Sequence, residues 1–247
     1  MKVSIKLDNK TFSSNLDFEK FDLWQISNFL EASHKLGEKL EEIETFFWSC
    51  ELIASIFSIK DQSLLDILHN QNIEKVISFV EQVPKESILS YVSSFKAQKI
   101  DFDVESKLQI SKHSLFNVQK VASKLLYKDN RSLAPQDRLK ARKYKEIKDK
   151  KQGISLWLGY FSTLSEIQEE NKGLYETSPN NFSHLKEVQE LNKIGEEENV
   201  RSLAEFLNIS IWEVRLMGYK EFCKSLLHLE TKNKAQNAIA KWANKKV

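Results

Sequence analysis

Apolar residues recur at three- and four-residue steps through much of this chain, which is the period of an amphipathic helix. The sharpest pattern lies at 33–58, where the apolar positions step by four and three without a miss: Leu36, Leu40, Ile43, Phe47, Cys50, Ala54 and Phe57. We expect one long buried helix there, at the centre of the N-terminal region, with an oligomer contact along part of it as the alternative. Shorter helices are predicted before it at 17–30 and after it at 63–69 and 73–83.

A second period, alternation of apolar and polar residues, marks two places as β structure. Val3, Ile5 and Leu7 alternate with polar residues, and the turn formers Asp8–Asn9–Lys10 follow, so the chain is predicted to open with a β-hairpin. Similar alternation at 88–95 and 100–104 predicts a second hairpin.

Three carboxylates, Asp101, Asp103 and Glu105, alternate with the apolar residues Phe102 and Val104 at the end of this second predicted hairpin. On a strand they would share one face, as a site for a hard divalent cation requires. The simpler interpretation is the wet face of a half-buried strand, because no second acidic cluster supports a metal.

The C-terminal block at 202–242 contains helix signals with almost no loops between them. Ser210 and Glu213 have the spacing of a capping box, and Gly218 permits a break. After it, Tyr219, Phe222, Leu226 and Leu229 line one helical face. The acidic run Glu196–Glu198 is expected to be a flexible junction before this block.

These patterns predict a mainly α protein with a small N-terminal β element. We expect an α+β N-terminal domain at 1–127 built around the 33–58 helix, a basic helical connector at 128–151, and a helical C-terminal domain at 152–247.

Composition narrows the function classes. Six glycines and three prolines in 247 residues leave few shaped loops, and the five histidines are scattered without metal-ligand spacing. No phosphate-binding glycine loop and no nucleophile motif occurs, so we expect no enzyme, no metal and no cofactor. The two cysteines are expected to be buried thiols in a reducing cytoplasm, and no apolar run is long enough to cross a membrane.

The formal net charge of +2 results from an uneven distribution of charge along the chain. Residues 128–151 carry ten basic and four acidic side chains, a net +6, which leaves −4 for the rest of the chain. Five cations with Tyr144 among them are candidate contacts to nucleic acid: Arg138, Lys140, Arg142, Lys143 and Lys145. A solvated helix is the favoured interpretation, and a contact to an acidic partner surface, such as another copy of the chain, is a third.

Large apolar side chains in the C-terminal block are the candidates for protein binding. They are Trp212, Met217, Tyr219, Phe222 and Leu226. Aromatic residues and methionine anchor interfaces when they are exposed, whereas at helical spacing they more often form a core.

The same block carries a resemblance. The phrases Leu203–Leu207, Ser210–Val214 and Tyr219–Phe222, ahead of a Lys- and Asn-rich helix, resemble small helical tail-assembly chaperones and related virion proteins of tailed bacteriophages. The segment 115–127 and the short opening strand are similar to proteins of phage structural modules. The chain is longer than typical tail chaperones and has an additional N-terminal region.

The resemblance implies a non-catalytic protein that shields or organises virion components through apolar helical faces. The partners it implies are tape-measure or tail-tube proteins or, given the extra N-terminal region, portal or neck proteins, with a homo-oligomer as a further possibility. The implied location is the host cytoplasm or the virion. The alternative function is a nucleic-acid-binding packaging or regulatory protein that uses residues 128–151.

Overall fold

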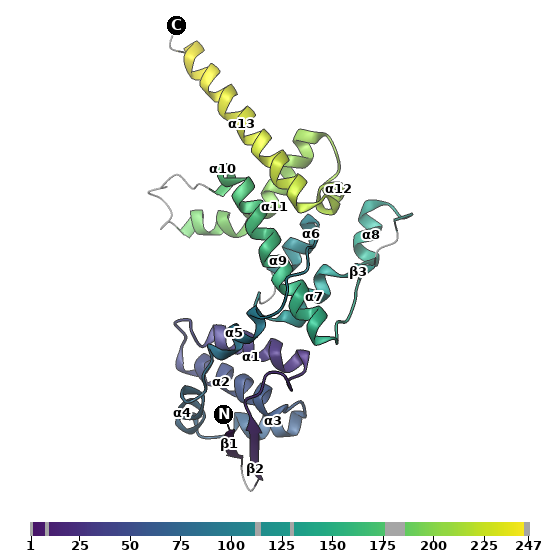
Figure 1. Ribbon diagram of the computed structural model, residues 1–247. Helices are drawn as coiled ribbons and strands as arrows, with labels where there is room; N and C mark the ends of the chain where they lie inside the picture. The colour runs from purple at the N-terminus through teal and green to yellow at the C-terminus, as the bar shows by residue number, and fades with distance from the viewer. Residues whose placement is uncertain (1, 8–9, 112–114, 129–130, 176–185, 245–247) are drawn as a thin grey trace. The chain divides into compact units, whose positions relative to one another are not determined.

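The computed structural model describes residues 2–7, 10–111, 115–128, 131–175 and 186–244 (Figure 1). Helices make up 68% of it, and a two-stranded antiparallel sheet opens the chain. This confirms the mainly α prediction with a small N-terminal β element.

The chain forms two compact units whose segments are interleaved in sequence. Unit 1 comprises Met1–Gln98, Ile110–Leu126 and Lys145–Leu158, and unit 2 comprises Lys99–Gln109, Tyr127–Tyr144 and Gly159–Val247. Neither unit is one continuous stretch, unlike the predicted regions 1–127 and 152–247. The division into 1–127, 128–151 and 152–247 stays a prediction.

Unit 1 is a hairpin followed by short helices around a central pair. Its elements are β1 (Lys2–Leu7), β2 (Lys10–Asn15), α1 (Leu23–Lys35), α2 (Glu42–Phe57), α3 (Gln62–His69), α4 (Ile73–Glu81), α5 (Ser87–Ser93), α7 (Val118–Leu125) and the first turns of α9 (Lys150–Glu170). In the hairpin, Val3 pairs with Ser14 and Ile5 with Phe12. Val3 and Ile5 are both buried. The first predicted hairpin is therefore confirmed, and its turn at Asp8–Asn9 lies outside the described residues.

The long helix predicted at 33–58 is wrong in its first third. Helix α1 ends at Lys35, and α2 begins only at Glu42, after a capping box between Glu41 and Glu44. The apolar period runs through the break because Leu36 and Leu40 lie in the connection. The buried part of α2 is 49–56, which packs against the buried face of α1.

The second predicted hairpin is also wrong. Residues 87–93 form helix α5, because Ile88 and Val92 are buried together at a four-residue spacing that satisfies a helix as well as a strand. The segment around Asp103 is extended for a few residues only. It pairs antiparallel with Gly218, where Val104 N donates to Met217 O (3.0 Å) and Tyr219 N donates to Phe102 O (2.8 Å).

Unit 2 holds most of the C-terminal helices. Its elements are α6 (Val104–Ser111, ending in unit 1), β3 (Tyr127–Lys128), α8 (Pro135–Ala141), β4 (Lys143–Tyr144), the rest of α9, α10 (Lys172–Tyr175), α11 (Lys186–Leu207), α12 (Ile211–Leu216) and α13 (Tyr219–Asn244). The capping box of Ser210 and Glu213 is present, and Gly218 separates α12 from α13, as predicted. Glu196–Glu198 lie inside α11, so the predicted flexible junction there is wrong.

Aromatic rings form the centre of unit 2. The ring of Phe102 lies 5.1 Å from that of Tyr160 and 5.5 Å from that of Tyr219, which in turn lies 6.0 Å from Phe222 (centroid distances). All four side chains are buried. Unit 2 therefore closes around the start of α13 and the extended segment beside it.

Candidate functional site

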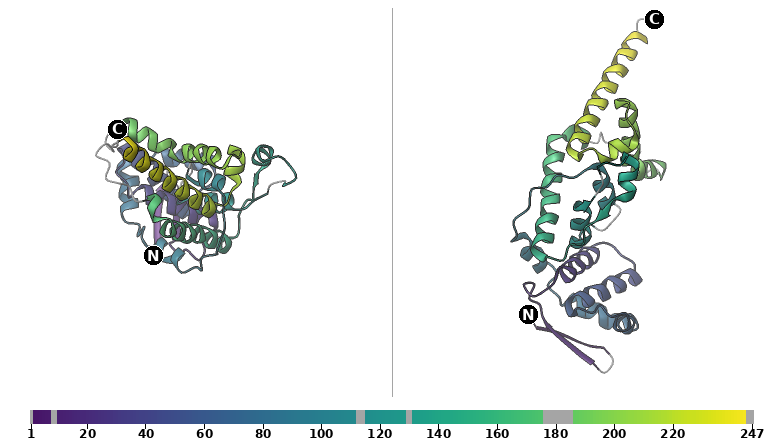
Figure 2. Two further views of the ribbon diagram at one scale, coloured as in Figure 1. Left: turned by 90° about the horizontal axis from the view of Figure 1, so that it is seen from above. Right: turned by 90° about the vertical axis from the view of Figure 1, so that its right-hand side faces the viewer.

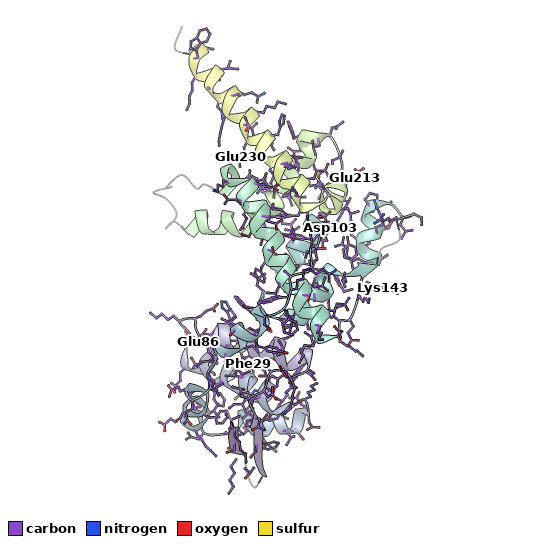
Figure 3. All side chains as sticks on the ribbon, viewed as in Figure 1. Phe29, Glu86, Asp103, Lys143, Glu213 and Glu230 are labelled. Carbon is purple, nitrogen blue, oxygen red and sulfur yellow. The ribbon has the colours of Figure 1, made fainter. Side chains whose placement is uncertain are left out.

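Helix α13 divides into a buried beginning and an exposed end. Tyr219, Phe222 and Leu226 are buried, whereas every residue from Thr231 to Ala243 is exposed. Figure 2 shows the last turns of α13 extending past the other helices of its unit, and Glu230, labelled in Figure 3, lies near the start of this part. A helix segment of this length is marginal on its own in water, so the exposed end of α13 (Thr231–Ala243) is a candidate binding element.

The exposed end of α13 carries an apolar stripe bordered by cations. The stripe consists of residues spaced by three and four positions: Ala235, Ala238, Ile239 and Trp242. Ile239 is 66% exposed and Trp242 is 60% exposed. Residues 231–247 contain five lysines and no acidic residue. By helical geometry, Lys234 and Lys241 follow one border of the stripe.

The five predicted protein-binding residues differ in how deeply they are buried. Tyr219, Phe222 and Leu226 belong to the core of unit 2 and are not available to a partner. Met217 is half-buried, and its carbonyl accepts the bond from Val104 N. Trp212 on α12 is 41% exposed, which makes it the most exposed of the five.

The predicted nucleic-acid residues differ in their burial and are divided between the two units. Lys140, Lys143 and Lys145 are exposed, but Lys145 belongs to unit 1 and the other two to unit 2. Arg138 is half-buried on α8. The solvated helix favoured for 128–151 is wrong, because among the residues described there only 135–141 and the first residues of α9 are helical. The two-residue strands β3 and β4 pair with each other.

Arg142 is buried, which removes it from both the nucleic-acid and the solvated interpretation. Its side chain is 2% exposed and forms an ion pair with Asp103, Nη2 to Oδ2, at 2.6 Å. The guanidinium also lies 3.5 Å from the ring centre of Tyr127, whose hydroxyl donates to Asp103. Burial alone lowers the pKa of Arg142, but the hydrogen bond and charge of Asp103 outweigh it and the net pKa is raised. Figure 3 contrasts Asp103 inside the unit with Lys143 near its surface.

The three alternating carboxylates have separate roles. Asp103 also caps α6, since its Oδ1 accepts from Ser106 N at 2.8 Å. Glu105 is buried and pairs with Arg215 at 2.7 Å, and the same arginine reaches Glu197 at 2.5 Å. Only Asp101 is exposed. The predicted wet strand face is therefore wrong: two of the carboxylates are buried and matched by arginines that are distant in sequence.

Within the described part of the chain, no group of three or more His, Cys, Asp or Glu side chains is arranged to hold a metal. Both cysteines are buried thiols, as the sequence predicts. Burial raises the pKa of Cys50 to about 12, so this thiol is neutral and unreactive in the folded protein.

Unit 1 has an exposed apolar face at the start of α2. Ile43 is 72% exposed and Phe47 is 45% exposed, although they continue the face that is buried further along at Cys50. Glu42 and Glu44 border this face on both sides. Ile43 and Phe47 define what we call the α2 face. Their periodicity suggested core, and the acidic residues on either side were the signal that they are exposed.

A groove adjoins the α2 face. It encloses about 590 Å³ between α1, α2 and α7, and its walls include the rings of Trp24, Phe47 and Trp48. Burial raises the pKa of Glu51 in this groove. The opposite wall, on α7, carries Lys120 and Lys124. Glu31 and Glu146 also line the groove, and Glu31 lies 4.0 Å from Lys120. The α2 side of the groove is therefore acidic and aromatic, and the α7 side carries both signs of charge.

No protein-family model matches this chain, and no curated protein or solved structure matches it. The resemblance to phage assembly proteins consequently stays a prediction from residues 202–242. Among the described residues, no helix is both long enough and apolar enough to span a membrane.

Proposed function

We propose that this chain is a non-catalytic assembly protein that acts through protein–protein contacts of its helices. The observation that carries the proposal is the exposed end of α13, with Ile239 and Trp242 66% and 60% exposed on one stripe. Amphipathic helices of this kind bind by laying the apolar stripe into a groove of a partner.

The resemblance of residues 202–242 directs the proposal to a phage structural module. Its phrases fall on the end of α11, on α12 and on the first turns of α13, which together anchor the exposed end of α13 in unit 2. The expected partners are structural proteins of the same particle: tape-measure, tail-tube, portal or neck proteins.

The test is affinity capture with the full chain, tagged at its N-terminus, from nuclease-treated native lysate, with washes at low and high salt. We expect a virion structural protein, identified by mass spectrometry, to survive high salt, because apolar contacts depend little on screening. A matched bait with Ile239→Glu and Trp242→Glu should lose it. A control bait with Leu133→Glu, which alters an exposed leucine elsewhere in unit 2, should keep it.

The contrary outcome is equally defined. Phosphate contacts weaken steeply as salt rises. Recovery of nucleic acid without nuclease, lost at high salt and with no protein partner at any salt, would replace this proposal by the nucleic-acid function.

A further inference from the structure

Two exposed apolar faces of this chain carry opposite charges. The exposed end of α13 presents Ile239 and Trp242 beside Lys241 and beside Lys234, which also lies 3.7 Å from Glu230. The α2 face presents Ile43 and Phe47 between glutamates. Residues 41–51 contain four glutamates and no base, whereas 231–247 contain five lysines and no acid. Helix pairs with an apolar seam and opposite charges along its borders select each other as partners.

We propose that the exposed end of α13 of one copy packs on the α2 face of a second copy. The proposal rests on the proposed function, because both treat the end of α13 as a protein-binding element. It goes further by assigning the partner: another copy of the same chain.

Charge fixes which side of unit 1 receives the helix. Glu42, Glu44 and Glu51 on α2 attract the lysines of α13, whereas Lys124 on α7 repels them and the charge of Lys120 is matched by Glu31 at 4.0 Å. The incoming helix therefore lies along α2.

Packing of these two helices in this way is a heterologous contact, since each copy supplies a different surface. Such contacts leave one unused surface at each end, so they build rings or open filaments and do not stop at a dimer. Self-association should consequently grow with concentration and should weaken with salt, because part of the attraction is between exposed charges.

The experiment is sedimentation velocity of the purified full chain over a concentration series. Two variants each lose one surface: Ile239→Glu with Trp242→Glu, and Ile43→Glu with Phe47→Glu. These side chains are exposed, and circular dichroism will check that the variants fold. Each variant alone should be monomeric at concentrations where the unaltered chain associates. A mixture of the two should give dimers and nothing larger, because only one intact pair of surfaces remains.

Two further variants test charge and specificity. Lys241→Glu or Glu42→Lys alone should weaken the association constant about threefold to tenfold, and the two reversals mixed should recover most of it. Leu89→Glu, which alters an exposed leucine of α5, should leave association unchanged.

A full chain that stays monomeric at every concentration overturns the proposal, as does self-association of the Ile43→Glu, Phe47→Glu variant alone. Failure here is separate from failure of the proposed function. A monomeric chain that still captures an identified virion protein loses only this inference. A self-associating chain that captures none keeps it and loses the broader function.

Discussion

The two units of this protein have cores of different chemistry. Unit 1 buries an apolar face between α1 and α2, in which Ile26, Phe29 and Ile53 are completely buried. Unit 2 buries an aromatic cluster together with the ion pairs of Asp103 with Arg142 and of Glu105 with Arg215. The first core follows from periodicity along the chain, whereas the second depends on pairings between distant residues.

The difference can be measured because each unit contains one buried thiol. Cys50 lies in unit 1 and Cys223 lies in unit 2. A buried thiol is labelled only when its surroundings open, so labelling resolved by peptide mass spectrometry reports the unfolding of each unit separately.

The largest effect is expected in unit 2. Arg142→Met leaves Asp103 as a buried charge without its partner, and should lower the free energy of unfolding by about 3 to 5 kcal/mol. Adding Asp103→Asn should restore most of this loss, since the amide can still cap α6 and carries no charge. Denaturant titration with Cys223 labelling measures both.

The matched control for this change is Lys143→Met, the same substitution at the exposed neighbour. It should alter stability by no more than about 0.5 kcal/mol. Equal losses at the two positions would mean that Arg142 is not paired in the core. If the Arg142→Met protein were normally stable but bound nucleic acid more weakly, Arg142 would be an exposed binding residue and not part of the core.

In unit 1 the comparison predicts a loss from packing alone. Ile53→Ala opens a cavity in the buried face of α2 and should cost about 2 to 5 kcal/mol, detected as earlier labelling of Cys50. Ile43→Ala on the same helix should cost at most about 0.5 kcal/mol, because Ile43 is 72% exposed. Similar costs at both positions would show that the α2 face is covered.

These two cores also explain what sequence reasoning could and could not reach. Local signals worked: the first hairpin, the capping box at Ser210 and the break at Gly218 each depend on neighbours in sequence. The prediction that Ile43 is buried was wrong, because periodicity identifies an apolar face and does not identify what covers it. The prediction of a strand at 88–95 was wrong, because Ile88 and Val92 fit both helix and strand spacing.

The candidate site was only partly accessible to the same reasoning. Arg142 was chosen as one cation among neighbours of like charge, but its partner Asp103 lies 39 positions away. A pairing at that separation leaves no local pattern in one sequence. Tyr219 and Phe222 were recognised as an apolar face, and only the position of Phe102 makes them core. The exposed stripe of Ile239 and Trp242 was within reach of the pattern and lay just beyond the residues chosen.

A smaller effect is expected from local capping in unit 2. Ser210 Oγ accepts from Glu213 N at 3.2 Å at the start of α12. Ser210→Ala removes this bond and should cost about 1 kcal/mol, measured by denaturant titration with Cys223 labelling. Ser90→Ala, in the exposed middle of α5, should cost nothing, because alanine has the highest helix propensity. If both changes are neutral, packing on α12 makes the cap redundant.

The smallest effect has the opposite sign and belongs to unit 1. Burial raises the pKa of Glu51, and the charge of Glu31 adds to this, against the opposing charges of His69 and Lys120. When the pKa of a carboxyl is higher in the folded protein than in the unfolded protein, the free energy of unfolding falls as the pH rises from the unfolded value to the folded value. The Glu51→Gln protein should therefore be slightly more stable than the unaltered chain at pH 7. This gain should vanish below the pKa that the carboxyl has in the unfolded chain.

The control is Glu42→Gln, which removes a favourable exposed carboxylate from the first turn of α2 and should give no gain in stability. Thermal unfolding of the three proteins between pH 3.5 and 7 separates these outcomes. A stability difference for Glu51→Gln that does not change with pH would contradict the prediction. It would mean that Glu51 is hydrated and that the groove beside it is open to water.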